Sequence, residues 1–140
     1  MKILNLTQHV ATPEQIEAGV YEPSKEYKDA IIGHLSFNVM PSWQELEKQA
    51  DALAQITMYL TSEQLGSTDD DGMPIFEPVI GARVMIGGAG FFLGVLERKL
   101  KEYGLQPVHA FSQRVSVDTH NSDGTVTKTS TFKHIGFIEA

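Results

Sequence analysis

Apolar residues recur along the chain in short runs and in helical stripes, and this pattern predicts an α/β domain. Residues 2–7 and residues 82–86 are short runs of mostly branched apolar residues, which is typical of buried strands. Between them, apolar side chains recur at steps of three and four residues, which predicts a long helix with one buried face. This helix opens at the capping box Ser42–Glu45, and its buried stripe consists of Trp43, Leu46, Ala50, Leu53, Thr57 and Leu60.

A glycine-rich turn joins the second predicted strand to another helix. Gly87, Gly88 and Gly90 follow that strand directly, residues 91–103 carry a helical apolar stripe, and residues 106–111 read as a strand again. Strand, turn, helix and strand in this order form a βαβ unit, whose two strands are parallel and whose crossover is right-handed.

Residues 20–80 look like a helical elaboration of this core. Just before them, Thr12–Gln15 has the residues of a helix start, and Gly19 ends the short helix. Residues 21–37 fit either a loop or another short helix. Residues 67–72 (STDDDG) are acidic, but they lack the alternating ligands and the distal Glu of a calcium loop, so we expect a solvated loop.

The C-terminal residues 107–140 predict a long antiparallel hairpin that continues the parallel core. β-branched and aromatic residues lie on both sides of Asn121–Gly124, and an Asp-Gly pair within such a pattern is a strong hairpin signal. We therefore expect one α/β domain over residues 1–140, with a mostly parallel sheet and a C-terminal antiparallel hairpin.

Composition and charge narrow the classes of function. The chain has 140 residues, 41% of them hydrophobic, and no Cys, which excludes disulfides, thiolate zinc sites and a Cys nucleophile and suits a reducing cytoplasm. No apolar run approaches the ~20 residues of a membrane span. The net charge of −7 argues against binding long nucleic acid. Residues 1–80 carry −9 and residues 81–140 carry +2, so an anion site should draw on the second part.

Two polar loops follow the predicted parallel strands. The turn Gly88–Gly90, with Ala89 at its centre, lets backbone N–H groups approach a phosphate beside a helix N-terminus; the alternative is a purely structural tight turn. Thr7, Gln8 and His9 follow the first strand. If the two strands are neighbours, both loops border one crevice, where His9 could act as an acid or base. The alternative is a loop histidine that bonds only to backbone.

A polar column along the hairpin is the third candidate. In one register Arg114 lies opposite Lys133, and in a register shifted by one residue Arg114 lies opposite Phe132 and Ser112 opposite His134. Either register gathers a serine and several cationic or titratable groups. The alternative is a twisted hairpin with exposed polar residues.

The three remaining histidines are assigned no chemistry. His34, His109 and His120 show no ligand spacing with one another or with carboxylates. We expect no metal and no cofactor.

Several stretches of the chain resemble a known family. LNLTQH with ATPEQ, VMIGGAGFF, PVHAFSQRVS and DGTVTKTSTFKHIGFIE are similar to small CRISPR-associated proteins of the ring-nuclease type. The resemblance covers about half of the chain and omits roughly residues 20–80. It implies a Rossmann-like three-layer sandwich that forms a cytoplasmic homodimer and cleaves a cyclic oligoadenylate without metal. In that reaction a ribose 2′-OH attacks the adjacent phosphorus and leaves a 2′,3′-cyclic phosphate.

The resemblance also implies roles for residues of the three clusters. The implied catalytic residues are His9, Ser112, Arg114 and His134, and the implied ligand-binding residues are Thr7, Gln8, Gly88, Ala89, Gly90 and Lys133. Three other readings remain: a non-catalytic module that senses or sequesters a cyclic nucleotide, a small protein that binds NADP, and a structural protein that dimerises through the helix of residues 43–60.

Overall fold

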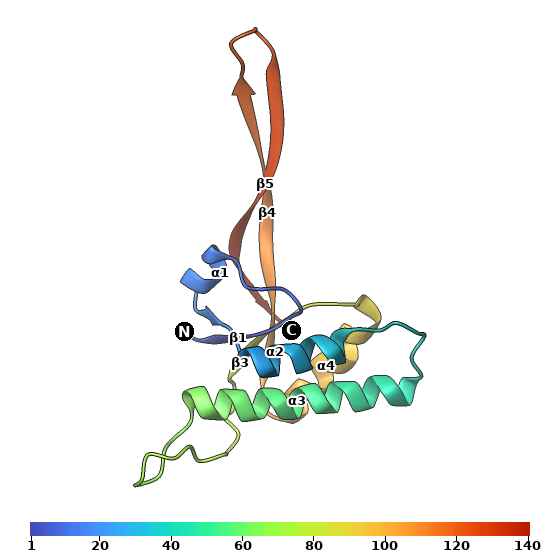
Figure 1. The fold of residues 1–140 in the computed structure, drawn as a ribbon, viewed down its shortest axis with the longest axis vertical. Helices are drawn as coiled ribbons and strands as arrows, with labels where there is room; N and C mark the ends of the chain where they lie inside the picture. The colour runs from blue at the N-terminus through green and yellow to red at the C-terminus, as the bar shows by residue number, and fades with distance from the viewer.

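The computed structural model describes all 140 residues and contains four helices and five strands (Figure 1). The elements, in chain order, are β1 (Ile3–Leu6), α1 (Pro13–Glu17), β2 (Val20–Tyr21), α2 (Lys25–Leu35), α3 (Trp43–Leu65), β3 (Arg83–Ile86), α4 (Gly90–Glu102), β4 (Gln106–His120) and β5 (Val126–Glu139). None of the helices is both long enough and apolar enough to cross a membrane.

The five strands form one sheet in the order β2-β1-β3-β4-β5. β1 pairs in parallel with both β2 and β3, β3 pairs in parallel with β4, and β5 is antiparallel to β4. The predicted α/β class, the mostly parallel sheet and the C-terminal antiparallel pair are therefore confirmed.

The two faces of the sheet are covered unequally. Leu4 and Leu6 of β1 and Val84 of β3 belong to the main core cluster, which also contains the buried side chains of α2, α3 and α4. The alternate strand residues belong to a smaller cluster with Ala11 and Phe137. Figure 1 shows α2, α3 and α4 on one side of the sheet and only the short α1 on the other. The three-layer arrangement is not confirmed, because the only helix on the second face is α1, which has five residues.

Local sequence signals account for most element boundaries. The predicted capping box of α1 is present: Thr12 Oγ1 accepts from Gln15 N–H, and the Gln15 side chain accepts from Thr12 N–H. The ambiguous residues 21–37 contain α2. The strand β2 was not predicted, since two residues carry no periodicity. The acidic loop is a tight turn in which Asp69 Oδ1 accepts from two backbone N–H groups.

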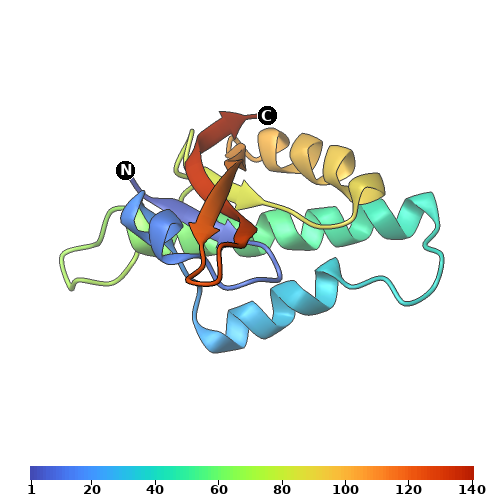
Figure 2. The same ribbon diagram turned by 90° about the horizontal axis from the view of Figure 1, so that it is seen from above.

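The hairpin of β4 and β5 projects far beyond the rest of the molecule (Figure 1), and in the view from above it is seen nearly end-on (Figure 2). We call residues 111–135 the arm; almost every arm residue is exposed. Arg114 lies opposite Phe132 and Ser112 opposite His134, which confirms the shifted register. The physical cause is the loop: Asn121 pairs with Thr125 around three residues that end in Gly124 at φ +86°, a common three-residue hairpin turn.

Two adjacent phenylalanines of α4 test where the core lies. Phe92 is fully buried, whereas Phe91 is 55% exposed. We expect Phe92→Ala to lower the free energy of unfolding by about 3–5 kcal/mol and Phe91→Ala by less than about 1 kcal/mol. Urea denaturation followed by circular dichroism measures both values. Equal losses for the two variants would contradict this packing.

Candidate functional site

A pocket with both polar and apolar lining residues lies at the carboxyl ends of the central parallel strands. Its volume is about 290 Å³, and it is bordered by the loop after β1, the glycine turn after β3 and the first third of β4. The lining residues include Thr7, Gln8, His9, Thr12, Gln15, Gly87, Gly88 and His109. β1 and β3 are parallel neighbours, and the chain leaves β1 for β2 on one side and returns to β3 on the other. Open α/β sheets bind ligands at such a switch point. The predicted crevice between the first two loops is confirmed.

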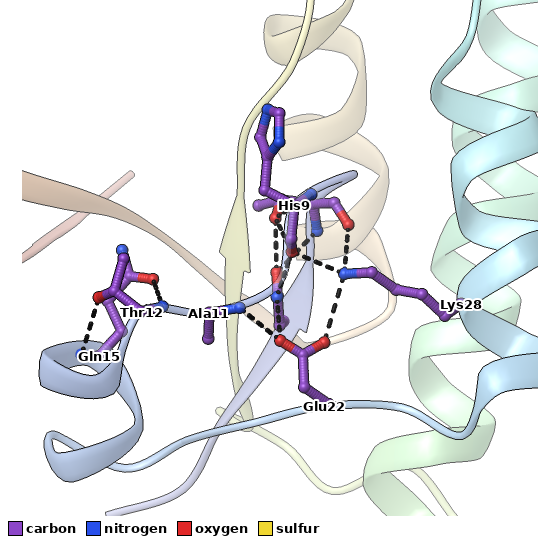
Figure 3. Close-up of polar contacts among 8 residues, drawn as sticks. His9, Ala11, Thr12, Gln15, Glu22 and Lys28 are labelled. Carbon is purple, nitrogen blue, oxygen red and sulfur yellow. Dashed lines mark hydrogen bonds and ion pairs between the residues drawn. The ribbon is translucent and has the colours of Figure 1, made fainter.

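The side chain of Asn5 holds the loop that carries His9. Asn5 is fully buried on β1, and its Oδ1 accepts from the Thr7 N–H at 3.0 Å and from Thr7 Oγ1 at 2.7 Å. Its Nδ2 donates to the His9 carbonyl at 2.8 Å and to Glu22 Oε1 at 2.7 Å. These bonds fix the backbone, while the His9 ring extends away from them (Figure 3). The His9 side chain is therefore free for a ligand.

Glu22 and Lys28 complete the support under this loop. Lys28 Nζ donates to the carbonyls of Thr7 and His9, both at 2.8 Å, and to Glu22 Oε2 at 3.3 Å. Burial raises the pKa of the Glu22 carboxyl, but hydrogen bonds from the Ala11 N–H and Asn5 and the charge of Lys28 together lower this pKa below its usual value. Lys28 is committed to the loop and does not line the pocket.

The glycine turn lies directly against the loop after β1. A Cβ on Gly87 would come within 3.3 Å of Thr7 Cγ2, and Gly88 has a φ of +133°, which side chains rarely adopt. Gly88 therefore needs glycine for its backbone conformation, whereas a side chain at position 87 would require Thr7 to shift by a few tenths of an ångström. Ala89 and Gly90 do not line the pocket; Ala89 caps α4, and Gly90 is its first residue. Of the predicted turn residues, only Gly88 borders the pocket.

His109 is the pocket residue that sequence analysis missed. It lies on β4, and its Nε2 is 2.6 Å from Glu97 Oε1 of α4. The carboxylate sets the orientation and tautomer of the ring, so that Nδ1 is the nitrogen left for a ligand. The one sequence signal for His109 is its position: it directly follows the parallel part of β4, where ligands of open α/β sheets bind. The Glu97 contact depends on how α4 packs on β4, which no spacing in the sequence reveals.

The polar column on the hairpin does not join the pocket within one subunit. Ser112, Arg114 and Lys133 are exposed on the arm and do not line it. Arg114 is four residues beyond Ala110, the last β4 residue of the pocket, or ~13 Å along the strand. His134 is nearer: its N–H donates to Glu14 Oε2 of α1 at 3.0 Å, and its ring lies 4.9 Å from that of Phe137.

A second cavity differs in chemistry. It has a volume of about 410 Å³ between β2, α2 and α3, and its lining includes Tyr21, Tyr27, Tyr59, Glu22 and Glu63. Burial raises the pKa of the Tyr21 hydroxyl to about 12. Carboxylates without a lining cation repel phosphate, so this cavity does not suit the predicted anion.

These features define an α/β domain with a switch-point pocket formed by a glycine turn, two histidines and a rigid polar loop. The chain belongs to the Uncharacterized protein MJ1673 family, whose model matches residues 1–138. No curated protein and no solved structure matches the chain. The resemblance to ring nucleases therefore stays a prediction.

The lowered pKa of Glu22 predicts an acid-dependent loss of stability. Ionised Glu22 stabilises the folded state above its unfolded pKa, which is near 4.5, and this contribution is lost as the pH falls through the lower folded pKa. We expect Glu22→Gln to be less stable than wild type at pH 7, by about 1 kcal/mol, and to lose less stability between pH 5 and pH 3.

The matched control is Glu26→Gln, which removes the same charge from the exposed side of α2. Urea denaturation at several pH values compares the three proteins. The account of Glu22 fails if the Glu22→Gln and wild-type stabilities decline in parallel below pH 5.

Proposed function

We propose that this protein is a metal-independent ring nuclease that binds a cyclic oligoadenylate at the switch-point pocket and cleaves it. The proposal includes a Rossmann-like relation to that class, a cytoplasmic homodimer and a role in CRISPR-type antiviral signalling. The observation that carries it is the convergence of the glycine turn, His9 and His109 at the carboxyl ends of parallel strands.

Phosphate is the ligand group that this pocket suits best. The glycine turn leaves its backbone accessible, and the N-terminus of α4 follows it directly. The first N–H groups of a helix have no partner within the helix, and its dipole attracts negative charge. A nucleotide phosphate beside Gly88 would also lie near the two histidines. This arrangement supports a ligand with a phosphodiester within reach of two imidazoles.

Two imidazoles supply the proton transfers that the cleavage requires. One accepts the proton of a ribose 2′-OH while the 2′-oxygen forms a bond to phosphorus. The bond from phosphorus to the 5′-oxygen of the next nucleotide breaks, and the second imidazole donates a proton to that oxygen. The products are a 5′-hydroxyl and a 2′,3′-cyclic phosphate. His109, oriented by Glu97, and His9 are the proposed pair.

The rest of a cyclic ligand would extend from the pocket toward the arm. A volume of about 290 Å³ holds only part of such a molecule. The arm leaves the sheet at its carboxyl edge, which is also the edge of the pocket. Ser112 and His134 lie at its base, with Arg114 and Lys133 next to them. In the proposal these side chains contact phosphates outside the pocket.

A binding module without catalysis is the second candidate. No Lys or Arg lines the pocket, so charge that develops on phosphorus lacks a direct cation within one subunit. Such a protein would sense or sequester the cyclic nucleotide and leave it intact.

Incubation with cyclic tetra-adenylate or cyclic hexa-adenylate in EDTA, followed by chromatography, tests cleavage. We expect linear products with a 2′,3′-cyclic phosphate from wild type and at least a ~100-fold slower rate for His109→Ala, because general acid–base catalysis typically contributes this much. His120→Ala is the matched control, because His120 lies at the far end of β4 and should leave the rate unchanged.

The alternatives give different results in the same assay. Thermal stabilisation by the cyclic ligand without product would replace the nuclease by the binding module. Intact ligand with no stabilisation, and with no change on adding Mg²⁺ or Mn²⁺, would refute both. NADPH serves as a further ligand: stabilisation by NADPH alone would favour dinucleotide binding.

Arg114 provides a separate test of the arm. If it contacts a phosphate of the bound ligand, Arg114→Ala should weaken binding or turnover at least ~tenfold, or about 1.4 kcal/mol. Titration calorimetry and single-turnover kinetics measure the two effects. Lys128→Ala, nearer the tip of the arm, is the control for loss of one positive charge. Unchanged values for Arg114→Ala would remove the arm from the site.

A further inference from the structure

The arm presents two faces of opposite character. Opposite residues of paired strands share a face, and the side chains of each strand alternate between faces. One face, which we call the Val/Thr face, carries only uncharged β-branched residues in its outer part: Val115, Val117, Thr119, Thr127, Thr129 and Thr131. The other face carries the charged or titratable residues Arg114, Asp118, His120 and Lys128, together with the exposed apolar residues Phe132 and Val126. Only the outer Val/Thr face lacks charge, so it is the face that a partner can cover without removing charged groups from water.

The arm as it stands is unusually exposed for its composition. Val117 is 45% exposed, and nothing else in the chain covers either face beyond Ser112. An isolated two-stranded ribbon is marginally stable in water, because it has no third strand or helix to bury its apolar side. We therefore expect another protein surface to pack on the Val/Thr face and to stabilise the hairpin.

We propose that a second copy of this chain provides that surface, and that two arms pack through their Val/Thr faces around a two-fold axis. The outer part of the face bears no charge, and its one charged residue, Lys133, lies at the base, so an identical face meets the outer part without repulsion, as a two-fold interface requires. In an antiparallel packing, the tip of each arm, with Asp123, lies toward the base of the other, with Lys133. The two Lys133 side chains then lie at opposite ends.

The charge distribution favours the same partner. The arm contains three basic and two acidic residues, whereas the rest of the chain contains eight basic and sixteen acidic residues. A weakly positive arm that reaches over a strongly negative body gains Coulomb attraction from a second copy. A long nucleic acid would gain from the arm but would be repelled by the body.

The area of the Val/Thr face limits how tightly two copies can associate. The part of the arm from Ser112 to His120 is ~30 Å long and ~10 Å wide, which gives ~300 Å² per copy, less than the ~800 Å² of a stable interface. Exposed Phe111 and Ile138 extend the same side of the hairpin at its base, and they are 48% and 55% exposed. We therefore expect a reversible dimer with a dissociation constant of ~1–100 μM.

Sedimentation equilibrium over a range of concentrations tests the proposal without any ligand; it bears on the homodimer of the proposed function but not on whether the pocket binds or cleaves a cyclic nucleotide. Wild type should pass from the monomer mass of 15.5 kDa to twice that mass. Val117→Asp should raise the dissociation constant at least tenfold, because two carboxylates would be buried at the axis. Ser116→Asp adds the same charge to the opposite face of the same strand and should leave the constant unchanged.

Cysteine cross-linking keeps the test informative if Val117→Asp disturbs the hairpin. The chain has no native cysteine, so single substitutions give unambiguous products. Val117→Cys or Thr129→Cys should give covalent dimers with a short bismaleimide reagent, since packed sheet faces lie ~10 Å apart, a gap that such a reagent spans and a direct disulfide does not. Ser116→Cys and Ser130→Cys should not. A protein that stays monomeric up to 200 μM, or equal cross-linking from both faces, overturns the proposal, as does a monomer that binds RNA through the arm.

Discussion

The buried side chain of Asn5 is the interaction on which the site depends. A polar group with no exposure must satisfy its hydrogen bonds within the protein, and Asn5 does so with the loop that carries His9 and with Glu22. Because each of its bonds also restrains a pocket element or its support, core and site share one network. Lys28 enters the same network from α2 and ties the loop to the helix layer.

The order of the strands in the sheet places this rigid loop beside the other elements of the pocket. β1 and β3 lie side by side although more than seventy residues separate them, so the fixed loop meets the glycine turn at one edge. β4 adds His109 from the next strand, and its continuation forms the arm. One strand thus connects the pocket to the exposed hairpin, and ligand binding and self-association are expected to involve neighbouring surfaces.

The unequal covering of the two sheet faces explains why the molecule has this shape. Three long helices bury one face, while the other has only α1, Ala11 and Phe137. The arm extends past both layers, where neither can cover it. The arm is exposed because β4 and β5 extend beyond the part of the sheet that the helices cover.

The sequence by itself determined the elements whose signals are local. Periodicity located α3 and α4, a capping box located α1, and the Asp-Gly pair located the hairpin turn, because each depends on residues within a few positions. The crevice between His9 and Gly88 also followed, since it needs only that two parallel strands be neighbours. Tertiary structure alone decided the Glu97–His109 contact, the separation of Arg114 from the pocket and the unequal covering of the two sheet faces. These depend on how helices pack and how far strands extend, and such distances are not encoded in any short stretch of sequence.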